Sequence, residues 1–346
     1  MIRADYYEHY WNQSLKIQMA FEWAARYCNF SYLLKADDDI FVNSKRLLDV
    51  LQLKSTPKKG LYMGKLHHNP FPAIHPEFKL WKTTLQHKTT LITKTVCTRH
   101  YPLLILVSST PANFERRYLI RQTWGADNNN VPQWKTYFLL GQTRDQTHSD
   151  LLKKEDSVYG DMIRADYYEH YWNQSLKIQM AFEWAARYCN FSYLLKADDD
   201  IFVNSKRLLD VLQLKSTPKK SLYMGKLHHN PFVQRDGKWR VSYEEYRETQ
   251  HPDFCSGAGF VMSYDVVKSV VPLFDVIKPY RLDDVYVGML AEKLGVRAVN
   301  HGGFVMPDIE ILRDECNFVP NTLVQHRAIG ECLITLFKIH NGSSEL

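Results

Sequence analysis

The stretch Phe191-Ser-Tyr-Leu-Leu-Lys-Ala-Asp-Asp-Asp-Ile-Phe-Val-Asn204 decides the fold and carries the most distinctive chemistry of the chain. Its apolar first half predicts a buried strand, and three consecutive acids, Asp198, Asp199 and Asp200, follow where that strand ends. A helix is expected next, over 205–212. We therefore expect the acids at the carboxyl edge of a parallel sheet, where open α/β sheets bind their ligands.

Strands and helices alternate on the N-terminal side of this stretch. The continuous apolar run at 103–107 predicts a buried strand, and 134–140 is expected to form another. Helices are expected over 113–121, 151–159 and 171–187. Such alternation predicts an α/β fold in which helices flank a mostly parallel central sheet.

An internal duplication complicates the chain. Residues 1–71 recur at 162–232 with a single substitution. One near-identical copy is unlike a repeat architecture, whose units diverge and recur several times. We predict a duplicated, non-functional segment over 1–71, a polar linker over 72–96 and a catalytic domain over 97–346. The second copy, joined to the fold at both ends, is expected to occupy the core.

Composition excludes several classes of protein. Of 346 residues, 45% are hydrophobic and 24% charged, as in ordinary globular chains, and no apolar run approaches the roughly 20 residues of a membrane helix. The net charge of +6 is scattered, whereas nucleic-acid grooves need clustered basic residues, so no nucleic-acid partner is expected. Six cysteines without C-x-x-C spacing disfavour a zinc ribbon and, with N-x-S/T sequons, fit a secretory compartment.

The acidic triplet is a candidate metal site. In an extended chain Asp198 and Asp200 share one face, so they can converge on a hard cation such as Mn²⁺ or Mg²⁺, while Asp199 points elsewhere. The alternative is a helix cap or a solvated turn, which the apolar neighbours and mutual repulsion of the acids disfavour. The spacing fits neither an EF-hand nor a P-loop. His326 is a candidate third ligand.

Three further groups could contribute to a site. Asp284 could act as a general base, cap a helix, or do both. Arg117 and Arg121, just after the first strand, could hold a phosphate or be structural. Gly257 and Gly259 lie in a predicted turn that permits close backbone approach, although it lacks the third glycine of a dinucleotide fingerprint.

Together these segments resemble the β1,3-glycosyltransferase family that includes β1,3-galactosyltransferases and β1,3-N-acetylglucosaminyltransferases. The resemblance covers roughly residues 97–326 and rests on four ordered motifs, Arg117–Gly125, Lys196–Asn204, Phe254–Ser263 and Asp283–Gly288. It implies a GT-A nucleotide-sugar fold. It also implies inverting, Mn²⁺- or Mg²⁺-dependent transfer of galactose or N-acetylglucosamine from a UDP-sugar to a glycan on a glycoprotein or glycolipid.

The resemblance also implies roles for individual residues. Asp198, Asp200 and His326 are expected to hold the metal against the diphosphate, and Asp284 is expected to deprotonate the acceptor hydroxyl. The residues expected on the donor side are Arg117, Arg121, Lys177, Asp198, Asp199, Gly257 and Gly259.

Location and cysteine pairing follow from the same resemblance. Family members are Golgi-lumenal and membrane-anchored, so an anchor is expected for the family and is missing from this chain. The family often has a cysteine where Leu290 stands, so Cys316 is expected to pair with Cys332 instead. All the candidate acids are present, which favours an enzyme over the alternative, an inactive truncated relative that binds glycans or other partners.

Overall fold

The computed structural model describes residues 90–93, 95–126, 131–306 and 316–342, with the single positions 33, 47 and 52. The chain divides into two compact units, Met1–His75 and Pro76–Leu346. Apart from those three positions, the copy at 1–71 lies outside the described residues, so its predicted lack of function stays a prediction. The following description concerns the second unit.

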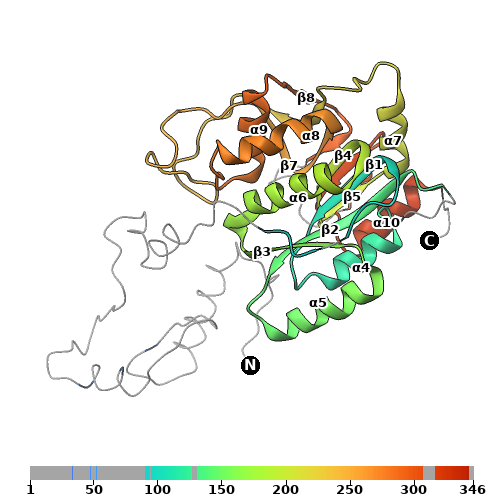
Figure 1. The fold of residues 1–346 in the computed structure, drawn as a ribbon, viewed down its shortest axis with the longest axis horizontal. Coiled ribbons are helices and arrows are strands. Elements are labelled where there is room, and N and C mark those ends of the chain that lie inside the picture. The colour runs from blue at the N-terminus through green and yellow to red at the C-terminus, as the bar shows by residue number, and fades with distance from the viewer. Residues whose placement is uncertain are drawn as a thin grey trace. The chain divides into compact units, whose positions relative to one another are not determined.

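A seven-stranded sheet with the order β3-β2-β1-β4-β7-β6-β8 forms the centre of this unit (Figure 1). Strands β3, β2, β1 and β4 are mutually parallel, β7 is antiparallel to both β4 and β6, and β6 is parallel to β8. The expected α/β class with a mostly parallel sheet is therefore confirmed. The strands are β1 (His100–Ser108), β2 (Trp134–Gln142), β3 (Met162–Tyr168), β4 (Asn190–Asp198), β6 (Tyr223–His228), β7 (Phe254–Ser263) and β8 (Ala298–Asn300).

Strands β1 and β4 lie at the heart of the sheet and end together. Their register pairs Leu104 with Leu194 and Ser108 with Asp198. Alternate residues of β1 enter different core clusters, Leu104 on one face and Ile105 on the other, so the strand is buried on both faces. The carboxyl end of β4 thus presents its acids at the edge of a rigid, fully covered sheet.

Helices cover both faces of the sheet (Figure 1). One face packs against α6 (Gln174–Tyr188), α8 (Tyr264–Val270) and α9 (Asp283–Lys293). The other packs against α4 (Phe114–Gln122), α7 (Ser205–Gln213) and α10 (Glu331–His340). Helix α5 (Gln146–Tyr159) adds Leu152 to a smaller cluster with Leu140 and Met162. The short helix η3 (Val271–Asp275) follows α8 directly.

A three-stranded sheet brings the C-terminal part of the chain to the acidic triplet. Its order is β5-β10-β9, with β5 over Ile201–Val203, β10 over Val324–His326 and β9 over Phe304–Val305. Strand β10 runs antiparallel to β5 and pairs His326 with Ile201. His326 therefore lies beside the residue that precedes β5, which is Asp200.

The second copy of the duplicated segment supplies a continuous part of this fold. Residues 162–232 form β3, the short helix η2 (Tyr171–Asn173), α6, β4, β5, α7 and β6. Strand β3 was not anticipated, because Arg164 and Asp166 interrupt its apolar pattern. The segment Phe254–Ser263 also differs from expectation: the turn expected at its glycines is instead the strand β7.

The end of the predicted linker belongs to the folded unit. Leu91 bridges Ala165 of β3, and the carbonyl of Thr95 accepts a hydrogen bond of 2.8 Å from the indole of Trp184. A disulfide then joins Cys97 to the residue after α6. Described residues on the N-terminal side of the boundary predicted at residue 96 therefore already contact β3 and α6, through Leu91 and Thr95.

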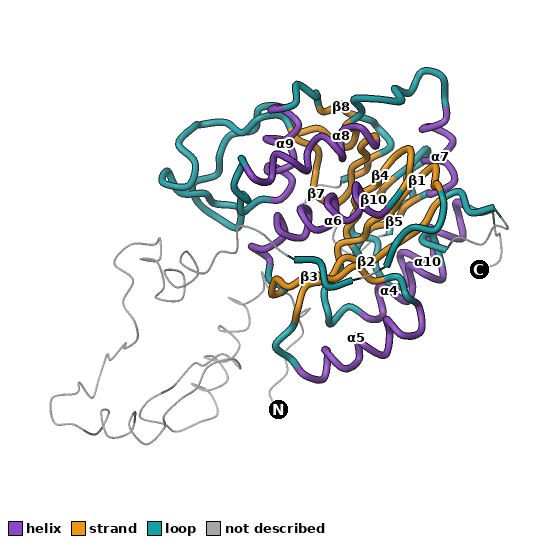
Figure 2. Tube along the Cα trace, in the orientation of Figure 1, coloured by secondary structure: helices purple, strands orange, loops and turns teal. Residues whose placement is uncertain are grey.

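A long connection, residues 229–253, joins β6 to β7 and is drawn mostly as loop in Figure 2. Arg235 holds it together: its guanidinium donates hydrogen bonds to the carbonyls of Val241 (3.0 Å), Tyr246 (2.9 Å) and Glu248 (2.6 Å). Val241 is fully buried. The loop is thus fixed by internal contacts despite its lack of regular structure.

Candidate active site

Asp198 is the last residue of β4, and Asp199 and Asp200 form a turn before β5, so the three acids point in different directions and not along one extended face as predicted. Asp198 Oδ1 lies 2.6 Å from Nζ of Lys196, and Asp200 Oδ2 lies 3.6 Å from Nε2 of His326. The side chains of Asp198 and Asp200 are 37% and 34% exposed, whereas Asp199 is buried. The outer two acids can therefore meet a ligand, and the middle one faces the protein.

Asp199 fastens the end of β4 to the segment after β1. Its carboxylate accepts hydrogen bonds from the hydroxyl of Ser109 (2.7 Å), the amide of Asn113 (2.8 Å) and the guanidinium of Arg116 (2.9 Å). Both oxygens are thus used within the protein. The expected donor contact of Asp199 is therefore corrected to a supporting position, from which it fixes the backbone that carries Asp198 and Asp200.

A divalent cation fits this edge only in part. Oδ1 of Asp200 is buried and has no hydrogen-bond partner among the described residues, which is the state of an oxygen awaiting a ligand. Burial opposes its ionisation, but the hydrogen bond and charge of His326, with the charge of Arg116, hold the pKa of Asp200 below its ordinary value. The carboxylate is therefore ionised at neutral pH, with Oδ2 toward His326 and Oδ1 buried.

The expected three-ligand metal site is not assembled. Within the described residues no three His, Cys, Asp or Glu side chains come close enough to share a metal ion, and Asp198 is turned toward Lys196. Sites that bind Mg²⁺ or Mn²⁺ together with a nucleotide commonly use one or two carboxylates and take the remaining ligands from phosphate and water. The residues present fit that sparser arrangement, centred on Asp200.

Lys196 connects the end of β4 to the start of α9, and we call this its hub role. Its side chain is buried, and its ammonium contacts the carboxylate of Asp198, the carbonyl of Gly257 and, at 3.6 Å, Oδ2 of Asp283. Burial alone would lower its pKa. The charges of Asp198, Asp283 and Asp284 outweigh this effect and keep the pKa of Lys196 above its usual range.

Asp284 lies in the first turn of α9 and faces the beginning of β7. Oδ2 accepts the backbone N–H of Gly257 at 3.2 Å, and Oδ1 accepts that of Val285 at 2.9 Å. Burial, reinforced by the charge of Asp283, raises the pKa of Asp284 to about 7. Asp284 is thus an acid of the first turn of α9 with a pKa near neutrality. It does not cap the helix, whose N-cap residue is Leu282, and its role as a general base stays a prediction.

The two glycines of β7 have different neighbours. A Cβ on Gly257 would lie 3.3 Å from Cβ and Oδ2 of Asp284, so a side chain there would press on the candidate base. A Cβ on Gly259 would lie 3.0 Å from Cγ1 of Val324 in β10. Gly257 borders the site, whereas Gly259 allows β10 to pack against β7.

Arg117 is part of the buried support below the triplet. Its guanidinium is fully buried and is paired with both carboxylate oxygens of Glu155, at 2.9 and 2.7 Å. Its remaining N–H groups bond to the hydroxyl of Ser109 and to the carbonyls of Thr110 and Pro111. All five donors are satisfied by protein, which favours a supporting position for Arg117 next to Ser109 over the expected contact with the donor.

Arg121 and Lys177 are also engaged within the protein. Arg121 bonds to Asp161 through Nε (2.8 Å) and Nη2 (2.9 Å) and to Glu155 through Nη1 (2.7 Å). Lys177 lies 2.7 Å from Glu169 and 2.6 Å from the carbonyl oxygen of Ser109. The sequence placed both beside a donor, but the structure shows them as buried ion-pair partners that hold the ends of β1 and β3.

Arg116 is the arginine that reaches the acidic triplet, and the sequence did not single it out. It lies next to Arg117, and its side chain is 36% exposed beside Asp199. Neighbouring helix residues differ by about 100° in direction, so only the packing of α4 could tell which of two consecutive arginines points to the site. Lys196 was missed for another reason: a lysine inside an apolar strand gives no signal of what it contacts.

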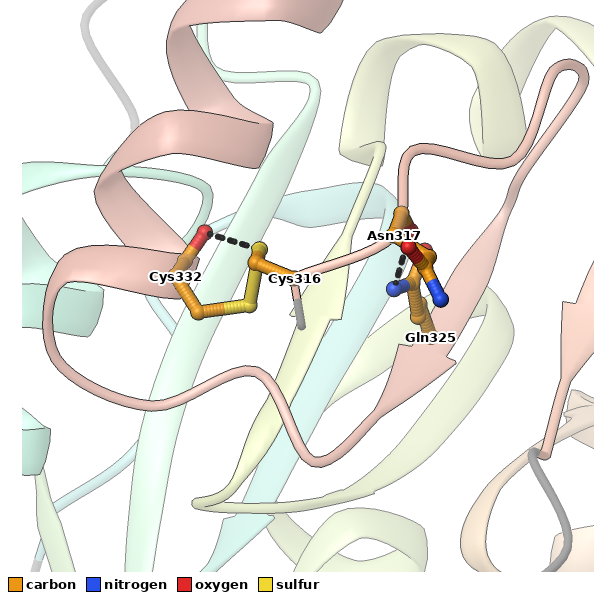
Figure 3. The surroundings of a disulfide bond; sticks show 4 residues. All are labelled: Cys316, Asn317, Gln325 and Cys332. Carbon is orange, nitrogen blue, oxygen red and sulfur yellow. Dashed lines mark hydrogen bonds between the residues drawn. A yellow bond between two sulfur atoms is a disulfide. The ribbon is translucent and has the colours of Figure 1, made fainter. Parts of the chain in front are cut away.

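A disulfide fixes the segment that carries His326. Cys316 pairs with Cys332, at the start of α10, as the resemblance implied (Figure 3). The bond closes a loop of 16 residues that contains β10, and such closures contribute about 3 kcal/mol by restricting the unfolded chain. Inside the loop, the side-chain amide of Gln325 donates to the carbonyl of Asn317 at 2.8 Å. Both contacts constrain the loop that contains β10.

Comparison with known proteins connects this site to a family. A family model described as Galactosyltransferase matches residues 1–100 and 115–302. Beta-1,3-galactosyltransferase 5 of Pan paniscus is 36% identical over 199 residues, which cover 56% of this chain and 66% of that protein. Beta-1,3-galactosyltransferase 1 of Mus musculus is 35% identical over 214 residues, covering 60% and 65%. The chain thus spans just under two thirds of the length of these relatives.

Solved structures give weaker likenesses. A mannosyltransferase from Pyrobaculum calidifontis, in complex with GDP-Man and Mn²⁺, matches with a TM-score of 0.37 and 8% identity over 65% of this chain and 62% of that one. The galactosyltransferase LgtC, in complex with donor and acceptor sugar analogues, matches with a TM-score of 0.38 and 11% identity, covering 70% and 97%. Because the family model covers well over half of the residues, the chain belongs to the galactosyltransferase family.

Proposed function

We propose that this chain transfers galactose from a UDP-sugar, in β1,3 linkage and with inversion, to a hydroxyl of a glycan on a glycoprotein or glycolipid. The observation that carries the proposal is the position of Asp284, a carboxyl titrating near neutrality that Lys196 and Gly257 connect to the acids at the end of β4. The names of the relatives favour galactose over N-acetylglucosamine, the other donor sugar that the sequence left open.

In this proposal Asp284 is the general base. Its carboxylate takes the proton of the acceptor hydroxyl as that oxygen attacks the anomeric carbon, and the bond from this carbon to the UDP oxygen breaks on the opposite side. A base works best when its pKa lies near the working pH, because it is then both ionised and basic. The backbone N–H groups of Gly257 and Val285 hold both oxygens of the base in place.

On the donor side, Asp200 and Asp198 would hold Mn²⁺ or Mg²⁺ against the diphosphate. When bound, such a metal neutralises charge that develops on the leaving UDP. Asp199, held by Ser109 and Arg116, keeps the strand end in register for this task. Desolvation raises the pKa of Asp198 to about 6, and the ammonium of Lys196 opposes this rise, so the carboxylate is mostly ionised at neutral pH.

The cellular setting is part of the proposal. Family relationship and the two disulfides, Cys97–Cys189 and Cys316–Cys332, support an oxidising lumenal compartment such as the Golgi. Within the described ranges, no helix has both the length and the apolar character needed to cross a membrane.

The proposal is tested with purified protein and four donors, UDP-galactose, UDP-N-acetylglucosamine, UDP-N-acetylgalactosamine and UDP-glucose, each with and without EDTA. We expect galactose transfer to glycan acceptors ending in a β-linked hexopyranose, a β1,3 product by NMR, and loss of transfer in EDTA. Preference for UDP-N-acetylglucosamine would change the donor but keep the reaction class. No transfer from any donor, by a protein that still binds glycans, would establish the inactive relative instead.

A further inference from the structure

Tyr171 and Trp239 form a hydrogen-bonded aromatic pair at the border of the candidate active site. Trp239 donates its indole N–H to the hydroxyl of Tyr171 across 3.2 Å, and the ammonium of Lys238 lies 5.4 Å from the centre of each ring. Tyr171 is 45% exposed and Trp239 is 37% exposed. Two large rings are thus fixed to each other while part of each meets solvent.

The exposure of this pair does not come from an unsupported loop. Trp239 lies in the 229–253 loop, which Arg235 fastens through three backbone carbonyls and which Val241 anchors in the interior. Tyr171 begins η2, directly before α6. A ring held on such a frame loses little conformational entropy when a ligand covers it.

The segment that contains Tyr171 and the loop that contains Trp239 are both connected to the residues just before α9. The hydroxyl of Ser175, at the start of α6, donates to the carbonyl of Tyr280. The guanidinium of Arg281 stacks on Trp172 at 4.3 Å from the ring centre and donates to the carbonyl of Arg240 at 2.8 Å. Trp172 and Arg240 are the immediate neighbours of the pair, so the pair and the acidic start of α9 form one connected structure.

The hydroxyl of Tyr171 lies within the electric field of the acids. Burial raises its pKa first, and the charges of Asp283, Asp284 and Asp198 raise it further, against the opposing effect of the bond from Trp239. The hydroxyl therefore stays protonated. Since it already accepts from Trp239, its own proton can be donated to a ligand oxygen on the side of the acids.

This combination has the chemistry of a sugar-binding surface. A hexopyranose has a face of C–H groups with partial positive charge, which suits the negative face of an indole or phenol ring. Its hydroxyl groups suit fixed donors at the rim, here the phenol of Tyr171 and the ammonium of Lys238. Binding sites for small polar molecules typically combine apolar walls with a few placed polar groups in this way.

We propose that the Tyr171–Trp239 pair binds the terminal hexopyranose of the acceptor glycan, with the sugar face on the indole and a ring hydroxyl accepting the proton of Tyr171. The inference rests on the proposed function, because it assigns the acceptor subsite of the same reaction. It places the acceptor on the α9 side of Lys196, opposite the donor side at Asp200.

The test separates acceptor binding from donor binding. Initial rates of the full chain are measured against acceptor and donor concentrations for wild type, Trp239→Ala, Trp239→Phe and Tyr171→Phe. Loss of the indole should raise the acceptor KM about tenfold, which is the upper range for one aromatic contact. Tyr171→Phe should raise it roughly threefold to tenfold, the effect of one hydrogen bond. The donor KM should not change.

A matched control is available on the same loop. Phe232 is 77% exposed, so Phe232→Ala removes a large exposed ring and leaves both members of the pair in place. We expect its acceptor KM to equal that of wild type. An unchanged acceptor KM in both Trp239→Ala and Trp239→Phe, or a parallel rise in the donor KM, would overturn the assignment. Because Trp239→Phe keeps a ring in place, it decides the matter if Trp239→Ala does not fold.

A second measurement distinguishes failure of this inference from failure of the proposed function. Intrinsic tryptophan fluorescence of wild type and Trp239→Phe is titrated with methyl β-D-galactopyranoside and methyl N-acetyl-β-D-glucosaminide. If the wild type transfers no sugar, the proposed function fails, but a saturable change that is absent from Trp239→Phe still establishes the sugar site. Equal responses of the two proteins would overturn it, whatever the transferase assay shows.

Discussion

The ammonium of Lys196 lies 2.6 Å from Oδ1 of Asp198, a carboxylate at the end of the central strand β4. The same ammonium lies 3.6 Å from the carboxylate of Asp283 at the start of α9. In the proposed reaction Asp198 faces the donor and Asp283 faces the acceptor. One buried cation therefore serves as the shared counter-charge of both halves of the site.

Replacing this cation should destabilise the fold. Lys196→Met leaves Asp198 and Asp283 without their buried partner, and we expect the free energy of unfolding to fall by about 3 kcal/mol, the lower range for breaking a buried ion pair. Urea unfolding followed by circular dichroism measures this. Lys35→Met is the matched control, because Lys35 occupies the equivalent position in the first copy of the repeat and has the same flanking sequence. An equal loss in both variants would contradict the hub role of Lys196.

Asp284→Asn should abolish transfer while leaving donor binding intact. The amide cannot accept the acceptor proton, so kcat should fall by about 100-fold or more, the usual contribution of a general base. In the wild type, kcat/KM should increase as pH rises through about 7, where Asp284 loses its proton, and then level off. Steady-state rates from pH 5 to 9, with calorimetric titration of UDP, decide this. An active Asp284→Asn enzyme would show that another group is the base.

The raised pKa of Asp284 also predicts how stability depends on pH. An aspartate in an unfolded chain titrates near about 4, whereas Asp284 in the folded chain titrates at about 7. Between these values the folded state binds the extra proton, so the free energy of unfolding should decrease as pH rises through this window. Asp284→Asn should show a weaker decrease. Urea midpoints at pH 5 and pH 8 test this, and identical pH dependence in both proteins would exclude Asp284 as the cause.

Metal affinity should reside in Asp200 and not in its duplicate. Removal of the carboxylate by Asp200→Ala should abolish Mn²⁺ binding in the presence of UDP, as measured by electron paramagnetic resonance, and transfer should stop. Asp39→Ala, the identical substitution in the first copy, should leave both unchanged. If Asp39→Ala were the variant that lost the metal, the first copy would be the functional segment.

Arg117 should matter for stability and not for the donor. Lysine cannot reproduce its paired bonds to Glu155 or its bonds to Ser109 and the two carbonyls, so Arg117→Lys should lower the free energy of unfolding by about 3 kcal/mol. The donor KM of the remaining folded enzyme should be unchanged. A large increase in donor KM without loss of stability would restore the nucleotide contact that the sequence suggested.

The central strands could be predicted because burial on both faces leaves an uninterrupted apolar run, as in Leu103–Val107 and Tyr193–Leu195. Strand β7 was taken for a turn because Gly257 and Gly259 weaken that signal. Their purpose is visible only once Asp284 and Val324 pack against them. The sequence pattern could place the two glycines near a site. It could not show which side chain packs against each of them.

The same limit applies to the candidate site. The acids at the end of β4 and the acid at the start of α9 were identified from spacing and resemblance. Whether an arginine reaches them depends on the rotation of α4 about its axis, which Ile120 sets by packing into the core. A local pattern does not contain that rotation, so Arg116 was passed over in favour of Arg117.

The disulfide partner of Cys97 distinguishes the two copies of the duplicated segment. Cys97 has one sulfur, and in this fold that sulfur is bonded to Cys189 of the second copy. The first copy carries an identical local sequence around Cys28. The Cys97–Cys189 bond therefore identifies the second copy as the one in the sheet, and a covalent bond persists after proteolysis. Because residues 1–59 and 162–220 are identical, only a disulfide-linked fragment that extends beyond this stretch, as far as Gly60 or Ser221, would show which copy is bonded to Cys97.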